Sequence, residues 1–290
     1  MEFGLILVPY HLGVERIGMG LGPERFLQAG IQRELGSRGY GIHTETIEYR
    51  PSTQQDEIVA VAEINALLAG HVRGALEQGR FPLMLAGNCN ACLGALAGIA
   101  ARPVGVIWLD AHGDFNTPET SPSGFLDGMA LAMAAGLCHH PALARIGVAP
   151  ISGSHIVQIG GRDFDEGEEE SLVRHKAQVM SASQMKQAGL AAALQPAFAT
   201  LRSQVRDVYL HVDLDVLDPA EGQANEYPAP NGLSLRELEG AIQMVGEEFV
   251  IKAAALTAYN PTCDEKGRAL GAGLRVIHAI VDTVAQRERE

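Results

Sequence analysis

The chain has 290 residues, 47% of them hydrophobic, and its 22 basic against 35 acidic residues give a net charge of −13. That negative charge argues against nucleic acid and anionic membranes as partners, and no apolar run reaches the roughly 18–20 residues that a membrane span needs. Four cysteines are too few for a disulfide framework, and residues 1–9 lack the basic start of a signal peptide, so we predict a cytoplasmic protein.

Apolar runs that alternate with helical patterns predict a single α/β domain over residues 1–290, because no linker or break in composition divides the chain. We expect strands at residues 3–8, 41–49, 81–86, 104–109, 155–160, 178–181, 207–212 and 250–256. We expect helices within residues 23–35, 55–77, 126–137, 169–176, 182–201, 234–247 and 271–287, with 138–154 a loop that has room for a short helix. The sheet should be mostly parallel, with helices on both faces and ligands bound beyond the carboxyl ends of its strands.

Two of these strands end in clusters of metal-binding residue types. The run at 104–109 is followed by Asp110-x-His112-x-Asp114, and the run at 207–212 by Asp213-x-Asp215. Strand side chains alternate faces with a period of two, so the members of each cluster can point the same way. Burying them unpaired would cost several kcal/mol, and they offer more ligands than one ion needs. We therefore predict a site for two divalent metal ions; the alternative is a pair of solvated acidic loops.

With these residues in view, the chain resembles the ureohydrolase family, which includes arginases, agmatinases and formiminoglutamases. The resemblance covers essentially the whole chain and is carried by Asp110-Ala111-His112-Gly113-Asp114, by residues 211–215 with Leu217-Asp218-Pro219, and by Gly22-Pro23. It implies a three-layer α/β/α fold with an eight-stranded, mostly parallel sheet. It also implies a binuclear cluster, most often of Mn²⁺, whose bridging hydroxide attacks a guanidinium carbon. Members of the family often form oligomers, so a homo-oligomer is an open expectation.

Under this resemblance the metal ligands are Asp110, His112, Asp114, Asp213 and Asp215, and the sixth ligand is unusual. The family's Gly-Gly-Asp-His-Ser motif reads Ala86-Gly87-Asn88-Cys89-Asn90 here, so Cys89 replaces a histidine. A thiolate adds negative charge to the cluster and favours a softer metal. The alternative is that Cys89 is a small buried apolar residue and that one metal binds weakly or not at all. Cys89-x-x-Cys92 also resembles a redox motif, but a single Cys-x-x-Cys pair is weak evidence for zinc binding or disulfide exchange.

The catalytic and carboxylate-binding positions also depart from the family pattern. The loop Ser123-Gly124-Phe125-Leu126-Asp127-Gly128 has Asp127 where the family has a proton-shuttling histidine. We therefore assign catalysis to Asp127 and to the ligand Asp114, while Asp127 as a helix-start acid is the plain alternative. Phe125 removes an amide that would contact a substrate carboxylate, whereas Asn116 and Ser123, which face that carboxylate in arginases, remain.

Of the other residues that bind substrate in arginases, this sequence keeps some and lacks one. Asp165 and, indirectly, Glu168 resemble the arginase residues that bind the substrate's α-amino group, although Asp165 as a turn acid is an equal alternative. Ala258, two residues before Asn260-Pro261, stands where arginases hold the guanidinium with a glutamate. We hypothesise that Glu226 supplies the missing charge, or that the neighbouring Tyr227 contacts a different head group.

These observations lead to a metal-dependent hydrolase of linear C–N bonds in a guanidine, hydroxyguanidine, amidine or amide. We expect a small, amino-acid-like substrate other than plain arginine. Residues 113–120 and Cys89 resemble a cysteine-ligand branch of the family that hydrolyses N-hydroxyarginine. One alternative is a catalytically inactive member that binds metal or ligand. A third alternative is a deacetylase-like amidohydrolase with a single zinc ion. The pattern of five predicted metal ligands argues against it.

Overall fold

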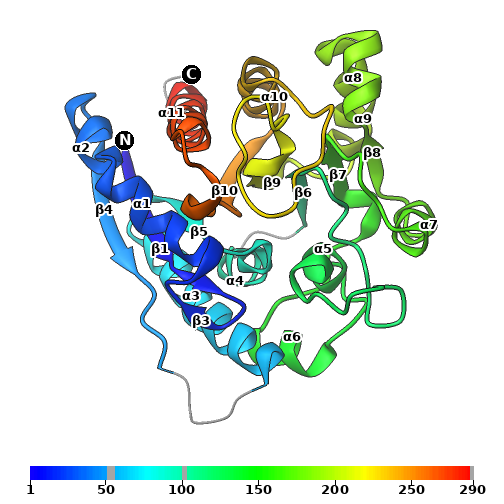
Figure 1. Ribbon diagram of the computed structural model, residues 1–290, viewed down its shortest axis with the longest axis horizontal. Helices are drawn as coiled ribbons and strands as arrows, with labels where there is room; N and C mark the ends of the chain where they lie inside the picture. The colour runs from blue at the N-terminus through cyan, green and yellow to red at the C-terminus, as the bar shows by residue number, and fades with distance from the viewer. Residues whose placement is uncertain (51–55, 100–102, 288–290) are drawn as a thin grey trace.

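A computed structural model describes residues 1–50, 56–99 and 103–287 and is built around one eight-stranded sheet (Figure 1). All its neighbouring strands run parallel, in the order β4-β1-β5-β10-β9-β6-β7-β8. The strands are β1 (Glu2–Val8), β4 (Gly41–Thr46), β5 (Phe81–Ala86), β6 (Val104–Leu109), β7 (Ile156–Ile159), β8 (Gln178–Met180), β9 (Asp207–Asp213) and β10 (Val250–Thr257). A separate antiparallel pair is formed by β2 (Tyr10–His11) and β3 (Val14–Glu15).

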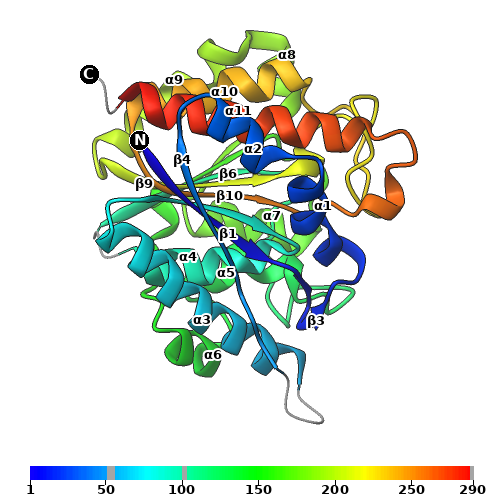
Figure 2. The same ribbon diagram turned by 90° about the vertical axis from the view of Figure 1, so that its left-hand side faces the viewer.

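Helices cover both faces of the sheet, as Figure 2 shows from the side. One layer contains α1 (Gly22–Gln28), α2 (Ile31–Ser37), α8 (Ala182–Ala188), α9 (Leu190–Arg202), α10 (Leu235–Glu248) and α11 (Arg268–Arg287). The other contains α3 (Glu57–Glu77), α4 (Cys92–Gly98), α5 (Ala130–Ala134) and α6 (His140–Ile146). Elsewhere lie α7 (Glu166–Arg174) and the 3₁₀ turns η1 (Gly18–Leu21), η2 (Cys89–Ala91), η3 (Asp127–Met129), η4 (Gly153–His155), η5 (Leu214–Val216) and η6 (Pro261–Cys263). The three-layer α/β/α fold with an eight-stranded parallel sheet that the sequence predicts is thereby confirmed.

The strand pattern explains this layering. Side chains of β6 alternate between two cores: Ile107 and Leu109 pack in the layer of α9 and α10, whereas Val106 and Trp108 pack in the layer of α3 and α4. Every residue of β6 is buried, as in a parallel sheet covered on both faces. The chain then leaves the sheet at Asp110, so polar residues begin where the apolar run ends.

Three predicted helices differ from the structure at their ends or centres. The helix expected over 23–35 is broken at Gly30, whose φ of +98° is left-handed, and the helix expected over 182–201 is broken at Gly189, with φ +85°. Glycine reaches such angles without the steric cost of a side chain. Within the stretch 126–137, only η3 and α5 are helical. The predicted start of α3 at Gln55 lies outside the described residues, and the pair β2–β3 was not predicted.

Among the residues that the structure describes, one helix, α3, is long and apolar enough to cross a membrane. Half of its apolar window is buried inside the protein, where α3 contacts α4 and α6. A buried core helix passes the same test, so this finding is weak evidence for a membrane span.

The carboxyl ends of the central strands form the functional edge of the sheet. Cys89 follows β5, Asp110 follows β6, and Asp213 closes β9. The start of α1 packs against the loop after β10: a Cβ at Gly22 would lie 2.3 Å from the Tyr259 carbonyl oxygen, so only glycine permits this approach. The Gly-Pro pair thus fixes one wall of this edge.

The capping box of α10 gives a test of the fold. The Oγ of Ser234 accepts the Glu237 N–H at 3.3 Å, and the Glu237 carboxylate accepts the Ser234 N–H at 2.8 Å. Ser234→Ala should lower the free energy of unfolding by about 1 kcal/mol, because it leaves a helix-end N–H without its partner. Urea denaturation measures the change, with Ser203→Ala on an exposed surface as control; equal stabilities for the two variants would contradict the assignment.

Candidate metal centre

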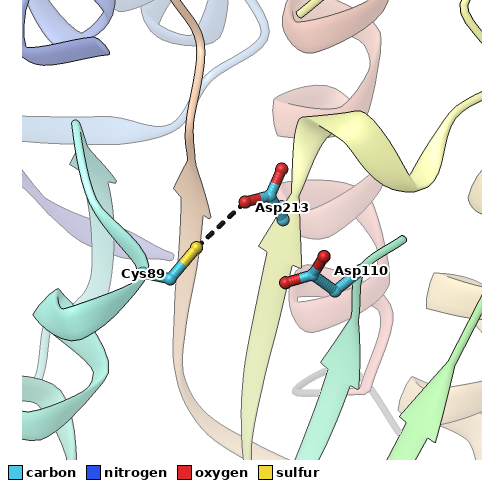
Figure 3. Close-up of side chains that lie close together, drawn as sticks. All are labelled: Cys89, Asp110 and Asp213. Atoms are coloured by element: carbon cyan, nitrogen blue, oxygen red, sulfur yellow. Dashed lines mark hydrogen bonds between the residues drawn. The ribbon is translucent and has the colours of Figure 1, made fainter. Parts of the chain in front are cut away.

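Three strand ends bring a thiol and two carboxylates together (Figure 3). The Cys89 Sγ lies 2.9 Å from the Asp213 Oδ2, although β10 separates their strands in the sheet. Donor atoms of Cys89, Asp110 and Asp213 all lie within 4.8 Å of one another, and all three residues are buried. This spacing allows one ion to contact all three.

A second group of donors adjoins the first. Donor atoms of Asp110, His112 and Asp215 also lie within 4.8 Å of one another. The His112 Nδ1 is 3.4 Å from the Asp110 Oδ1 and 3.5 Å from the Asp215 Oδ2. Because Asp110 belongs to both groups, the geometry could hold two neighbouring ions with a shared carboxylate.

Neighbouring donors orient these carboxylates. The indole N–H of Trp108 donates to the Asp110 Oδ2 at 3.0 Å, and the His112 backbone N–H donates to the Oδ1 at 2.7 Å. The Asp215 backbone N–H donates to Asp213 at 2.8 Å, and the Asn225 amide donates to the Asp215 Oδ2 at 2.9 Å. Such outer contacts fix the direction of metal ligands before an ion binds.

A buried histidine supports the cluster from the strand side. His211 stacks on Trp108 with ring centroids 3.6 Å apart, and its ring nitrogens contact the hydroxyls of Tyr209 at 3.0 Å and Thr257 at 3.2 Å. Burial lowers the pKa of His211 to about 3, so the ring is neutral. The Thr257 hydroxyl also lies 3.3 Å from the Cys89 Sγ, which links His211 to the thiol.

The carboxylates raise one another's pKa. Burial and the neighbouring Asp215 raise the pKa of Asp110 to about 6, and burial with the charges of Asp215 and Asp110 raises that of Asp213 well above its ordinary value. Burial with the charge of Asp110 does the same to the pKa of Asp114. Burial also opposes ionisation of Asp215, but His112 outweighs it and lowers the Asp215 pKa to about 2. The cluster therefore favours a nearby positive charge.

The residues present fit a divalent cation. Burial lowers the pKa of His112, yet Asp215 and Asp110 outweigh it, so the pKa of this imidazole is raised. Only the neutral ring binds metal, so a cation bound here would take the place of that proton. Burial and the adjacent Asp213 raise the pKa of the Cys89 thiol, so Cys89 would need a cation beside it to act as a thiolate ligand. The carboxylate oxygens suit Mn²⁺, whereas the imidazole and the thiol favour a softer metal such as Zn²⁺.

The cluster forms the floor of a cavity of about 710 Å³. Asp110 lies beneath it with 1% exposure. Every other predicted site residue lines it: Cys89, His112, Asp114, Asn116, Ser123, Asp127, Asp165, Glu168, Asp213, Asp215 and Glu226. No lysine or arginine lines the cavity in the described part of the chain, so its walls are strongly acidic.

The predicted amine-binding residues form one wall. The Asn116 amide donates to the Asp165 Oδ2 at 2.9 Å, and the Glu168 Oε1 accepts the Phe115 backbone N–H at 2.7 Å. Burial raises the pKa of Glu168 to about 7. A Cβ at Gly113 would lie 2.6 Å from the Glu168 carboxyl carbon, so this close packing requires glycine.

Asp127 is held against the loop that carries Cys89. Its carboxylate accepts the Asn88 amide at 2.5 Å and the Asn90 backbone N–H at 3.0 Å. Burial raises the pKa of Asp127 although these hydrogen bonds oppose it. Asp127 does stand in the first turn of η3, as the helix-start interpretation requires, but its contacts reach across to another element.

The opposite wall has no carboxylate at Ala258. This residue is buried with φ +62°, and its carbonyl accepts the Asn225 amide at 3.2 Å. Glu226 lines the cavity nearby and accepts a hydrogen bond from the Asn260 amide. Tyr227 also lines the cavity, with its ring centroid 5.4 Å from that of Phe125.

Several supporting residues were not predicted as part of the site. Asn225 and Thr257 have no local sequence signal, because their partners come from distant segments. Arg162 donates to the carbonyls of Asp215 at 2.9 Å and Ala229 at 2.8 Å, and so joins two loops. Cys89 and Cys92 are free, and the Cys92 Sγ points to the Ala130 carbonyl at 3.8 Å.

The chain is similar to proteins of known sequence and structure. It matches the arginase family over residues 1–281. It is 36% identical over 277 residues to an arginase of Bacillus caldovelox, covering 91% of this chain and 92% of that protein. It is 32% identical to an arginase of Bacillus subtilis, over 96% of both chains. A crystal structure of arginase from Bacillus cereus matches with a TM-score of 0.88 and 33% identity, covering 97% of this chain and 98% of that one.

The shared carboxylate gives a direct test of the centre. Asp110→Asn should reduce bound divalent metal from about two ions per chain to fewer than one, because it removes a charge that both donor groups use. Elemental analysis of the folded variants measures this. Asp163→Asn is the matched control. Its carboxylate is near the centre, 3.9 Å from His112, but its side chain is 68% exposed and belongs to neither donor group. Equal metal content in the two variants would contradict a ligand role for Asp110.

Proposed function

The chain belongs to the arginase family of metal-dependent hydrolases that act on guanidino C–N bonds, and we propose that it is a two-metal enzyme for an amino-acid-like substrate other than plain arginine. The proposed ligands of two divalent ions, most simply Mn²⁺, are Cys89, Asp110, His112, Asp114, Asp213 and Asp215. A small-molecule substrate is the proposed partner. A cytoplasmic location and a homo-oligomeric state remain predictions.

One observation carries the proposal of a two-metal hydrolase. Asp110 belongs to two donor groups, each within 4.8 Å, at the floor of an open cavity. A structural metal site is closed by protein ligands, whereas a catalytic one leaves room for water and substrate. Two divalent ions, when bound, activate water at neutral pH and polarise the bond that breaks.

Residues in the cavity wall can bind the substrate or transfer a proton to it. Asp165 accepts a hydrogen bond from Asn116 but keeps acceptor capacity for a substrate amine, with Glu168 fixing the loop behind it. The Ser123 hydroxyl is exposed at the mouth and can donate to a carboxylate. Asp127, oriented by Asn88 and Asn90, is the group we propose to transfer a proton to the departing nitrogen.

The proposal about the substrate rests on Ala258. A guanidinium bound beside the metals would find no carboxylate at this position. Glu226, which also lines the cavity, already accepts a hydrogen bond from Asn260. A hydroxyguanidine holds its positive charge less strongly than a guanidinium and has an additional polar group. Together with Cys89, this supports an N-hydroxyarginine-like substrate over arginine.

An inactive binding protein is the second candidate. The Cys89 thiol donates to Asp213 at 2.9 Å and so satisfies that carboxylate without a metal. If this arrangement persists in solution, the chain should bind fewer than two ions and turn over none of the guanidines, hydroxyguanidines or amides offered to it.

The substrate proposal is tested by comparing N-hydroxy-L-arginine with L-arginine on the Mn²⁺-loaded protein. We expect kcat/KM for the hydroxyguanidine to exceed that for arginine by about tenfold or more, because Ala258 offers no charge partner to a guanidinium. Urea release measures both rates, and Asp110→Asn should abolish them. Faster hydrolysis of arginine would refute the substrate proposal, whereas no turnover together with fewer than two bound ions would support the inactive alternative.

Glu226→Gln tests whether this residue compensates for Ala258. The glutamine keeps the acceptor for Asn260 and removes only the charge, so kcat/KM for the best substrate should fall about tenfold or more. Glu221→Gln, on the same loop but outside the cavity lining, should leave kcat/KM unchanged. An unchanged rate for Glu226→Gln would end the compensation hypothesis.

A further inference from the structure

A second cavity lies at the opposite edge of the sheet, where the strands begin. It has a volume of about 400 Å³ and is bounded by the amino ends of β5 and β10, by the loop before β9 and by the end of α11. Figure 2 shows this edge on the left, away from the loops after the strands. Strands of six to eight residues separate it from the metal centre by roughly 20–27 Å.

Basic residues surround this cavity in a chain of net charge −13. Arg80, Arg206, Lys252 and Arg287 line it, and no acidic residue does so within the described part of the chain. Elsewhere, arginines of the same helical layer are paired, as in the Arg275–Glu239 salt bridge of 2.6 Å. Within the same described residues, the side chains of Arg80, Arg206 and Lys252 make no ion pair, so their charge is available to a ligand.

Strand β10 is irregular where it supplies the lysine. Ile251 pairs with Val208 and Ala253 with Tyr209, so Lys252 is the extra residue of a β-bulge. A bulge changes the direction of a side chain and is frequent beside functional sites. Lys252 is partly exposed, whereas Ile251 and Ala253 on either side of it are buried.

The cavity also has an apolar floor. Phe81 and Ile251 are each 7% exposed, and Val284 is 8% exposed, although all three line it.

Helix-end electrostatics explains only part of the positive charge around the cavity. Arg287 lies in the last turn of α11 and Arg80 shortly after α3, where cations complement the helix dipole. Arg206 follows the end of α9 by four residues, but Lys252 lies within β10, so that explanation does not cover Lys252.

We propose that this cavity binds a phosphate-bearing organic anion of the nucleoside triphosphate class. Guanidinium groups match phosphate oxygens through paired hydrogen bonds, and several of them around one space favour a multiply charged ligand. The floor of Phe81, Ile251 and Val284 accommodates the less polar body of such a molecule. The cavity at the metal centre has no lysine or arginine in its lining within the described part of the chain, so the two sites differ in chemistry as well as in position.

Calorimetric titration with ATP tests the proposal, in excess Mg²⁺ so that ATP does not remove the protein's own metal. We expect saturable binding with one site per chain, and binding about tenfold weaker in each of Arg80→Ala, Arg206→Ala and Lys252→Ala. Arg236→Ala is the matched control, because this exposed arginine of α10 lies outside the cavity lining. Adenosine, which lacks the charge, should bind far more weakly than ATP.

Three results would overturn the proposal: no saturable binding at millimolar ATP, binding that the three cavity variants leave unchanged, or adenosine binding as tight as that of ATP. Circular dichroism of each variant shows that it is folded before it is titrated. Arg206 is exposed, so its substitution in particular should leave the fold intact.

Discussion

Mutual repulsion of buried carboxylates is the constraint on which this structure depends. Asp110, Asp114, Asp213 and Asp215 are each 7% exposed or less and meet at the ends of two adjacent strands. Their charges are unfavourable so close together unless a cation lies among them. Hydrogen bonds from Trp108, the backbone and Asn225 hold the carboxylates in this arrangement. The fold thus maintains an arrangement that metal binding would stabilise.

The sequence predicts the sheet and the acidic clusters well, because both depend on local patterns. Apolar runs of strand length end in acids spaced by two residues, and these acids lie together in the structure. Contacts between distant segments could not be predicted, since nothing near Asn225 or Thr257 specifies their partners. For the same reason the basic cavity was missed: Arg80, Arg206 and Lys252 are far apart in the chain and meet only when the strands align. The helix breaks at Gly30 and Gly189 show the limit of periodicity, because the spacing of apolar residues does not reveal the left-handed φ that these glycines adopt.

The departures from the arginase pattern affect connected parts of one cavity. Cys89 contacts both Asp213 and Thr257, and through Thr257 it is linked to His211, so this cysteine belongs to a buried hydrogen-bond network. Ala258 and Glu226 lie on the opposite wall and are joined through Asn225 and Asn260. Substitutions in one family can therefore keep the fold while changing the residues that line the cavity.

A crystal structure with Mn²⁺, read by anomalous scattering, tests the central claim most directly. Our account predicts two anomalous peaks on either side of the Asp110 carboxylate, one beside Cys89 and Asp213 and the other beside His112 and Asp215. A single peak away from Asp110, or no peak in crystals grown with excess Mn²⁺, would contradict it. In that case the buried acids would have to be neutralised by protons, and the proposal of a two-metal hydrolase would fail.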